Sequence, residues 1–304
     1  QEALEKEAKA LTRVVTRPND DEMLAGIQAS VAKGRRPLLV DVATRFGREH
    51  SKTVVKSAAE SGAYVVLYST EANEADVYMP LVKETGAHEI WVYAMSMVDA
   101  YPASFKQRTP VRYMPPGYSP KLDLKVNLAS PNRQTYTVGF LGVLWLRPEK
   151  IQHVMRAEFG DRLYNTSKIW DSWSMRDFLE RYPLQINMHK DQTCCPHSES
   201  EVSAMEAFRL ATLLANHACV ISTPVGPNDT TMWDGIVHWA EPDQAMKAAR
   251  SLENSVSQCQ ETSSKLFKLR FDPARLMRAT GFLNVWHPHA QSAKRKFPWA
   301  AWGR

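Results

Sequence analysis

The first third of the chain alternates short apolar runs with longer stretches in which apolar residues recur at helical spacing. This alternation is typical of a parallel sheet covered by helices. Gly34, Gly62 and Gly86 each follow a predicted helix, where glycine commonly ends the helix. The pattern therefore predicts a Rossmann-like unit. Its expected strands are Leu11–Val15, Pro37–Val42, Tyr64–Tyr68, Glu89–Tyr93 and Val111–Tyr113, and its expected helices are Asp20–Lys33, Glu49–Ser61, Glu74–Thr85 and Ser96–Phe105.

The pattern restarts after Pro115–Pro120, which is the densest cluster of breaker residues in the chain. A buried strand is expected over Thr137–Gly142, followed by a helix that begins near Pro148. Two α/β units in tandem predict a central cleft between facing strand ends, where open parallel sheets bind ligands. The later expected elements are the strands Leu184–Met188, Cys219–Ser222 and Ile236–Trp239, and the helices Ser203–Asn216, Pro242–Val256 and Ser263–Thr280.

These boundaries divide the chain into four parts. We expect an N-terminal Rossmann-like domain over 1–118 and a linker over 119–135. A C-terminal Rossmann-like domain would occupy 136–260, and a C-terminal helix with a basic aromatic tail would occupy 261–304. The predicted fold class is therefore α/β with two Rossmann-like domains.

Composition narrows the class of protein. The 304 residues are 44% hydrophobic and 23% charged, the balance of a globular protein with a real core, and no apolar run is long enough to span a membrane. The formal charge of +5 favours an anionic ligand but is too small to indicate nucleic acid, so no nucleic-acid partner is expected. The chain opens with Gln1, which leaves the compartment open: cytoplasmic or, if an N-terminal anchor has been removed, the Golgi lumen.

The cysteines do not predict a metal site. Cys194 and Cys195 are adjacent, whereas Cys219 and Cys259 stand alone, and no spacing matches that of a zinc site. A disulfide framework is not expected either.

A first candidate site follows the predicted strand at 137–142. Gly142 makes a turn, and Arg147 and Lys150 then place two cations near the start of a helix. Helix-end amides and cationic side chains suit a diphosphate because they act on the same anion. The alternative is a solvated first helical turn.

Three further candidates lie in the second half of the chain. His189 follows a buried strand, at the end where α/β sheets present ligand-binding groups, although a lone histidine is more often structural. Glu206 and Arg209 are three residues apart near the start of a predicted helix. They form either an intrahelical ion pair or a site in which Glu206 accepts a sugar hydroxyl while Arg209 neutralises a phosphate.

Glu71 is the candidate from the first half of the chain. It follows the strand Tyr64–Tyr68, so its loop would face the cleft. There it is either a binding or catalytic group, or an acid that favours the start of a helix.

Taken in order, these segments resemble the donor-binding half of a GT-B glycosyltransferase. The similarity rests on Val138–Gly142 with Arg147 and Lys150, on Asn187-x-His189, on Glu206-x-x-Arg209 and on Val220-x-Ser222. It is nearest to a bacterial and giant-virus branch in which an Asn-x-His strand precedes a Glu-x-x-Arg helix. Upstream, the loop at Tyr68–Glu71, the Glu89–Tyr93 strand and the Pro115–Tyr118 linker are similar to the same branch.

The resemblance implies transfer of a sugar from a nucleotide-sugar donor to a carbohydrate or glycoconjugate acceptor, with the donor as co-substrate, no other cofactor and no metal. Arg147 and Lys150 would face the diphosphate, with Gly142 and Arg209 beside them, and Glu206 would face the ribose or donor sugar. Glu71 and His189 are the candidate catalytic bases. The sequence also has no Asp-x-Asp motif of the kind that holds a divalent ion to a diphosphate.

An alternative is a catalytically inactive GT-B-fold protein that serves as a structural or assembly subunit. It is motivated by Leu214, which stands where many relatives carry a second glutamate, and by the Cys-containing insertion Asp191–Glu201. The basic aromatic tail is a candidate for contact with a membrane surface or a protein partner. In GT-B proteins the last helix also often crosses back to the first domain, where Trp286, Trp299 and Trp302 would lock it.

Overall fold

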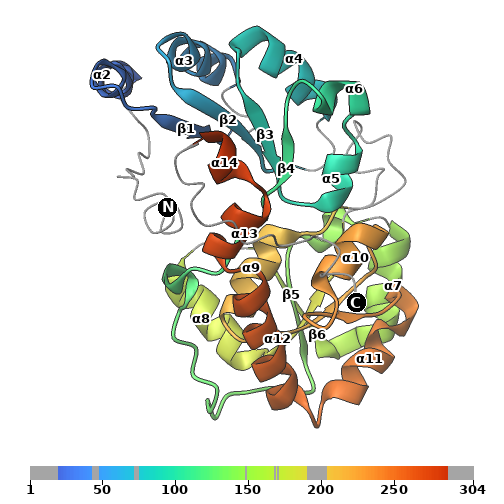
Figure 1. Cartoon of the computed structure of the whole chain (residues 1–304). Coiled ribbons are helices and arrows are strands. Elements are labelled where there is room, and N and C mark those ends of the chain that lie inside the picture. Colours follow the sequence, from blue (N-terminus) through green and yellow to red (C-terminus); the bar gives the residue numbers. More distant parts are fainter. Residues whose placement is uncertain are drawn as a thin grey trace.

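A computed structural model of the chain has two lobes, each built on its own parallel sheet (Figure 1). It describes residues 20–42, 48–71, 75–147, 149–167, 169, 171–189 and 204–286, with the backbone only at 48–51, 146 and 150. The predicted strand Leu11–Val15 and the segment 191–201 lie outside these residues, as does the tail beyond Trp286. Among the described residues, no helix has the length and apolarity needed to cross a membrane.

The first lobe contains a four-stranded sheet in the order β1-β2-β3-β4. The central strands β2 and β3 are buried along almost their whole length, which explains why their sequences are mostly apolar. Gly34, Gly62 and Gly86 have φ of +68°, +93° and +71°, so they end helices in the left-handed region as predicted. The elements are α2 (Asp20–Ala32), β1 (Leu38–Asp41), α3 (Arg48–Glu60), β2 (Tyr64–Ser69), α4 (Ala75–Thr85), β3 (Glu89–Val92), α5 (Met95–Asp99), α6 (Ala103–Lys106) and β4 (Val111–Tyr113).

The second lobe contains a five-stranded parallel sheet in the order β6-β5-β7-β8-β9. Its elements up to the central strand are η1 (Pro120–Leu122), β5 (Val138–Leu141), η2 (Leu144–Leu146), α7 (Glu149–Phe159), η3 (Gly160–Arg162), β6 (Leu163–Thr166), α8 (Ser172–Arg181) and β7 (Leu184–Asn187). Its later elements are α9 (Ala207–Ala215), β8 (Cys219–Ser222), α10 (Pro227–Trp233), β9 (His238–Trp239), η5 (Pro242–Gln244), α11 (Ala245–Leu252) and α12 (Val256–Arg270).

Several predicted helices are shorter or divided. The helix predicted over 96–105 is two, α5 and α6, because Pro102 cannot continue the hydrogen-bond ladder. The helix predicted over 263–280 is also interrupted: the Asp272 side chain accepts from the Arg275 amide and caps a new helix, α13 (Pro273–Ala279).

The end of the described chain returns to the first lobe, as predicted (Figure 1). The last helix, α14 (Phe282–Trp286), lies beside β1 and β3: Arg36 donates to the Val285 carbonyl at 3.0 Å, and the Trp286 indole donates to the Arg36 carbonyl at 3.3 Å. The Phe282 ring meets the Trp91 ring edge-on, with centroids 5.0 Å apart. Helix α14 therefore ties the two lobes together. Trp299 and Trp302 lie outside the described residues.

The carboxyl edges of the two sheets face each other, as a central cleft requires. Asp229 of α10 accepts hydrogen bonds from the backbone amides of Met95 and Ser96, at 2.7 and 3.0 Å, just beyond the carboxyl end of β3. The Phe208 ring of α9 contacts the rings of Tyr68 and Tyr93, at centroid distances of 6.0 and 5.3 Å. Side chains that leave the carboxyl ends of either sheet thus converge on one region.

Candidate active site at the carboxyl edge of the second sheet

Most of the predicted site residues lie at the carboxyl edge of the second sheet. The strands β5, β7 and β8 are neighbours there, and they end at Leu141, Asn187 and Ser222. Because these strands are parallel, the loops that follow them emerge side by side. The start of α9 joins the same edge through Glu206. The structure thereby brings together Gly142, Arg147, His189, Glu206 and Arg209.

The Arg147 side chain is buried. The sequence alone had left open a solvated position in the first turn of a helix. Arg147 has 1% of its side-chain surface exposed, and its Nε donates to the Met188 carbonyl at 3.1 Å. One guanidinium nitrogen lies 3.8 Å from the Glu206 carboxylate. The bond to Met188 fixes the guanidinium between the ends of β5 and β7.

Glu206 stands immediately before α9 rather than within it. The helix predicted over 203–216 begins only at Ala207, because the preceding residues turn sharply: the Ala207 amide donates to the Met205 carbonyl at 2.7 Å. The Glu206 carboxylate lies 3.3 Å from Arg209, so the intrahelical pair weighed from the sequence is present in part. Its other oxygen faces Arg147, and a quarter of the side chain remains exposed.

Arg209 is held by the Asn-x-His segment. Its Nη1 donates to the side-chain carbonyl of Asn187 at 2.8 Å, and the Asn187 amide donates to the Ser222 hydroxyl at 2.9 Å. Asn187 and Ser222 are both fully buried. The three sequence motifs at 187–189, 206–209 and 220–222 thus form one hydrogen-bonded network.

The Phe140 ring lies beneath both guanidinium groups. The Arg147 and Arg209 Cζ atoms are 5.4 and 5.8 Å from the ring centroid, which is within the range of cation–π attraction. A Cβ at Gly142 would meet that ring at 2.9 Å, which explains why this turn position is glycine. Sequence analysis did not select Phe140, since a buried aromatic residue in a strand normally signals only core packing.

His189 is 8% exposed and neutral at physiological pH. Burial lowers the pKa of its imidazole to about 4, which outweighs the opposing effect of the Glu206 carboxylate. Its Nε2 lies 3.0 Å from the Thr223 carbonyl, which can only accept, so Nε2 carries the proton. Nδ1 is then an acceptor, and it has no hydrogen-bond partner among the described residues.

Two predicted residues are not joined to this network by the described contacts. Glu71 is exposed at the carboxyl end of β2, where its carbonyl accepts from the Ser69 hydroxyl at 3.1 Å. Tyr68, three residues earlier in the chain, contacts Phe208 of the second lobe. The backbone of Lys150 lies in the first turn of α7, but its side chain is outside the described atoms.

The charge balance of the edge suits an anion. The guanidinium groups of Arg147 and Arg209 face one carboxylate, that of Glu206, while His189 is neutral. Two guanidinium groups and one carboxylate thus lie together at this edge. By contrast, a polar pocket of about 410 Å³ at the amino edge of the same sheet is remote from this cluster; it is lined by Pro131, Asn132, Arg133, Gln134, Tyr136 and Arg181.

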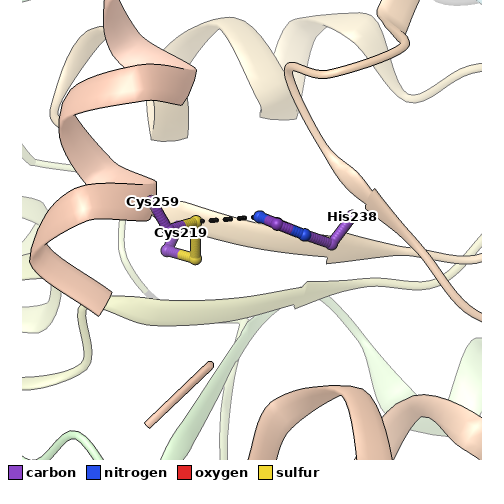
Figure 2. A group of neighbouring side chains, drawn as sticks. All are labelled: Cys219, His238 and Cys259. Atoms are coloured by element: carbon purple, nitrogen blue, oxygen red, sulfur yellow. Dashed lines mark hydrogen bonds between the residues drawn. A yellow bond between two sulfur atoms is a disulfide. The ribbon is translucent and has the colours of Figure 1, made fainter. Parts of the chain in front are cut away.

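In the described part of the chain, one group of side chains has the residue types of a metal site, and it lies away from the candidate active site. Cys219, His238 and Cys259 offer ligand atoms within 4.8 Å of one another, with Cys219 and Cys259 joined as a disulfide (Figure 2). The sequence did not predict this pairing, because the two cysteines are 40 residues apart and meet only when α12 packs on β8.

No family profile and no curated protein matches the sequence. Solved structures do match. A sucrose-phosphate synthase from Thermosynechococcus elongatus aligns with 92% of this chain and 82% of its own, at 12% identity and a TM-score of 0.50. AviGT4, a glycosyltransferase involved in avilamycin A biosynthesis, aligns with 85% of this chain and 98% of its own, at 10% identity and a TM-score of 0.42. The lipopolysaccharide outer core galactosyltransferase WaaB aligns with 86% and 80%, at 11% and 0.39.

Identities this low bear on the fold alone. Two parallel α/β sheets with facing carboxyl edges, and a last helix that returns to the first lobe, form the arrangement that the sequence predicted. The fold of this chain is therefore the GT-B arrangement of two Rossmann-like domains.

Proposed function

We propose that the chain is a glycosyltransferase that moves a sugar from a nucleotide-sugar donor to a carbohydrate or glycoconjugate acceptor. The observation that carries the proposal is the convergence of Arg147, Arg209 and Glu206 over the Phe140 ring, at the carboxyl edge of the second sheet. This edge is where open α/β sheets bind ligands, and guanidinium groups suit a diphosphate because they donate charge-assisted hydrogen bonds to its oxygens.

In the proposed reaction, the acceptor hydroxyl oxygen forms a bond to the anomeric carbon, and the bond from that carbon to the diphosphate oxygen breaks. The electron pair of the broken bond leaves with the nucleoside diphosphate. Arg147, Lys150 and the first amides of α7 would stabilise this developing charge without a divalent ion. The fixed Arg147 guanidinium requires little reorganisation during the step, because Met188 already orients it.

Glu206 and His189 would hold hydroxyl groups. The partly exposed Glu206 carboxylate would accept from the ribose or donor sugar, next to the arginines that bind the diphosphate. The neutral His189 imidazole presents Nδ1 as an acceptor. Glu71 would approach the acceptor from the first lobe. Glu71 and His189 are the two candidates for the catalytic base, which takes the proton that the acceptor hydroxyl loses as the new bond forms.

Nucleoside diphosphates test the donor site directly. We expect one of UDP, GDP, ADP or TDP to raise the midpoint of thermal unfolding, since a ligand that binds only the folded protein stabilises it. Arg147→Met and Glu206→Ala should make that shift much smaller. Arg162→Ala is the matched control, because it also removes an arginine paired with a glutamate, Glu253, but at the start of β6, away from this edge.

The same panel separates the two candidate functions. A nucleotide shift that depends on Arg147 supports a working donor site, and incubation with the corresponding nucleotide sugar should then release the nucleoside diphosphate. Absence of any shift at millimolar nucleotide would contradict the proposal and favour an inactive structural subunit. Leu214 is consistent with that alternative, because it is fully buried in the core where many relatives carry a glutamate.

A further inference from the structure

A disulfide and a histidine lie together at the end of β8 opposite the candidate active site. Cys219 begins β8 and Ser222 ends it, so about 10 Å of strand separates the two regions. Cys259 reaches Cys219 from α12, and His238 reaches it from the edge strand β9 (Figure 2). Three elements that are remote in sequence therefore each supply one side chain with soft or borderline ligand atoms.

The three side chains point toward one another. The His238 Nε2 atom lies 3.2 Å from the Cys259 sulfur, and all three ligand atoms fall within 4.8 Å (Figure 2). The two cysteines are almost completely buried, whereas His238 is exposed. This leaves one side of the group open to solvent, where an ion could enter and a water molecule could complete its coordination.

We propose that reduction of the Cys219–Cys259 disulfide creates a binding site for one Zn²⁺ ion, with Cys219, Cys259 and His238 as its protein ligands. A dithiol or phosphine reductant supplies two electrons, and two protons complete the two thiols. Zn²⁺ then displaces both thiol protons and binds the two thiolates and the imidazole nitrogen. The disulfide and the metal-bound dithiolate are alternative states of the same residues.

Zinc fits the charge and the geometry of this position. Two thiolates neutralise a divalent ion, so the complete site adds no net charge to the buried cysteines. Zinc–sulfur bonds of about 2.3 Å in a tetrahedral site place two sulfurs about 3.8 Å apart. That spacing becomes accessible once the S–S bond is broken, because the ligand atoms already lie within reach. The buried Ser263 hydroxyl, 3.9 Å from the Cys259 sulfur, can donate to its thiolate.

Bound zinc would tie together β8, β9 and α12. In the reduced protein without metal, strand pairing would still join β8 to β9, but only packing would join α12 to them at this point. We therefore expect Zn²⁺ to raise the thermal unfolding midpoint of the reduced protein and to leave that of the oxidised protein unchanged.

Cobalt reports on the same ligands by absorption. The whole protein is reduced with a phosphine, freed of reductant without air and titrated with Co²⁺. We expect one equivalent to bind, with thiolate-to-cobalt charge transfer in the near ultraviolet, and Zn²⁺ to displace it. The oxidised protein should give no such band.

Variants identify the ligands. His238→Ala should weaken Zn²⁺ binding more than about a hundredfold, since loss of a direct ligand exceeds the 10- to 100-fold effect of an outer-shell change. Its exposed position makes it the variant least expected to disturb folding. Cys259→Ser should abolish the charge-transfer band. The matched control replaces Cys194 and Cys195 with serine and should keep full binding.

Three results would overturn the proposal: no charge-transfer band in the reduced wild-type protein, a band that persists unchanged in His238→Ala, or one that disappears in the Cys194 and Cys195 control. The last result would assign the metal to the adjacent cysteines. None of these outcomes depends on nucleotide binding at the opposite edge of the sheet.

Discussion

Two groups of charged side chains, one in each lobe, differ in how deeply their carboxylate is buried: Glu89 is fully buried, whereas a quarter of the Glu206 side chain is exposed. In the first lobe, the fully buried Glu89 carboxylate accepts from the Tyr64 hydroxyl at 2.9 Å, the Trp91 indole at 2.5 Å and the Arg112 guanidinium at 3.0 Å. Arg112 also donates to the Thr280 carbonyl, just before α14. Every partner of this cluster belongs to the protein, so we assign it a structural role.

The second cluster lies at the sheet edge where ligands bind. Glu206 lies 3.8 Å from Arg147 and 3.3 Å from Arg209, and a quarter of its side-chain surface is exposed. His189 presents a buried Nδ1 atom without a hydrogen-bond partner in the described part of the chain. A protein that keeps such groups at a sheet edge sacrifices stability there, which is typical of a binding site. We therefore assign the Glu89 cluster to folding and the Glu206 cluster to ligand binding.

The largest expected effect is on the first cluster. Glu89→Leu leaves Tyr64, Trp91 and Arg112 without their common acceptor and Arg112 without its carboxylate. Removing one partner of a buried ion pair costs about 3–5 kcal/mol, so we expect a loss of that size in urea unfolding. Nucleotide binding by the fraction that remains folded should be unchanged. A loss below about 1 kcal/mol would contradict the structural role.

His189 predicts a pH dependence of stability. Its pKa falls from 6.5 to about 4 on folding, because burial disfavours the charged imidazole. The unfolded chain therefore binds a proton as pH falls below about 6.5, while the folded protein does not until about pH 4. Stability contributed by neutral His189 is thus complete above pH 6.5 and lost toward pH 4, by roughly 3 kcal/mol.

Urea unfolding of the wild type and of His189→Gln across this range measures the effect. The difference between the two unfolding free energies should change with pH only between about 4 and 6.5. His153→Gln, at an exposed position on α7, is the control and should track the wild type. A parallel pair of pH profiles for wild type and His189→Gln would show that the imidazole is not held neutral by burial.

Asp229 extends the comparison to the boundary between the lobes. Its carboxylate oxygens accept from the amides of Met95 and Ser96 and are fully buried, so it resembles Glu89 rather than Glu206. Asp229→Asn keeps the shape but replaces one acceptor oxygen with a donor. We expect a loss of about 1–3 kcal/mol in urea unfolding, since a charged hydrogen bond is lost and one amide is left unsatisfied. Asn228→Ala, whose partner Asp99 is exposed, should lose less than half as much.

Sequence patterns predicted the buried strands closely. β2, β3 and β8 are mostly apolar, and their bounds differ from prediction by at most one residue. The partly exposed edge strand β4 was also predicted with its exact bounds. β6 and α8 were not predicted. β6 is an edge strand whose adjacent residues Tyr164 and Asn165, which point to opposite faces, are both exposed, so it lacks an apolar pattern. The short β9 was predicted too long for a similar reason: only His238 and Trp239 pair with the sheet.

The sequence predicted where the site lies in the fold, but it did not predict which contacts its side chains make. Strand ends in a parallel sheet share one edge, so His189, Glu206 and Arg147 could be expected together. The burial of Arg147 could not, because it depends on the Met188 carbonyl and the Phe140 ring beneath it. The roles that we propose for these residues stay predictions until ligand binding is measured.

We expect the smallest change in stability from Arg147→Met. This variant also tests most directly whether the Glu206 cluster differs in role from the Glu89 cluster. Arg147→Met replaces a buried guanidinium with an apolar side chain of similar length, while Glu206 keeps Arg209 as an ion-pair partner at 3.3 Å. Methionine removes the desolvation cost of the cation and its repulsion toward Arg209, and these gains offset the lost bond to Met188. We expect the free energy of unfolding to change by less than about 1 kcal/mol.

Arg112→Met is the matched substitution in the first cluster and leaves Glu89 buried without its cation, so it should cost about 3–5 kcal/mol. Calorimetry with the nucleoside diphosphate that stabilises the wild type then compares the nucleotide affinities of the two variants. In affinity, Arg147→Met should show the larger loss. Arg147→Met should weaken nucleotide binding by about 10- to 100-fold, since one charged hydrogen bond contributes about 1.5–3 kcal/mol, whereas Arg112→Met should leave it unaltered. If Arg147→Met proved as destabilising as Arg112→Met and bound the nucleotide normally, both clusters would be structural and the donor site would lie elsewhere.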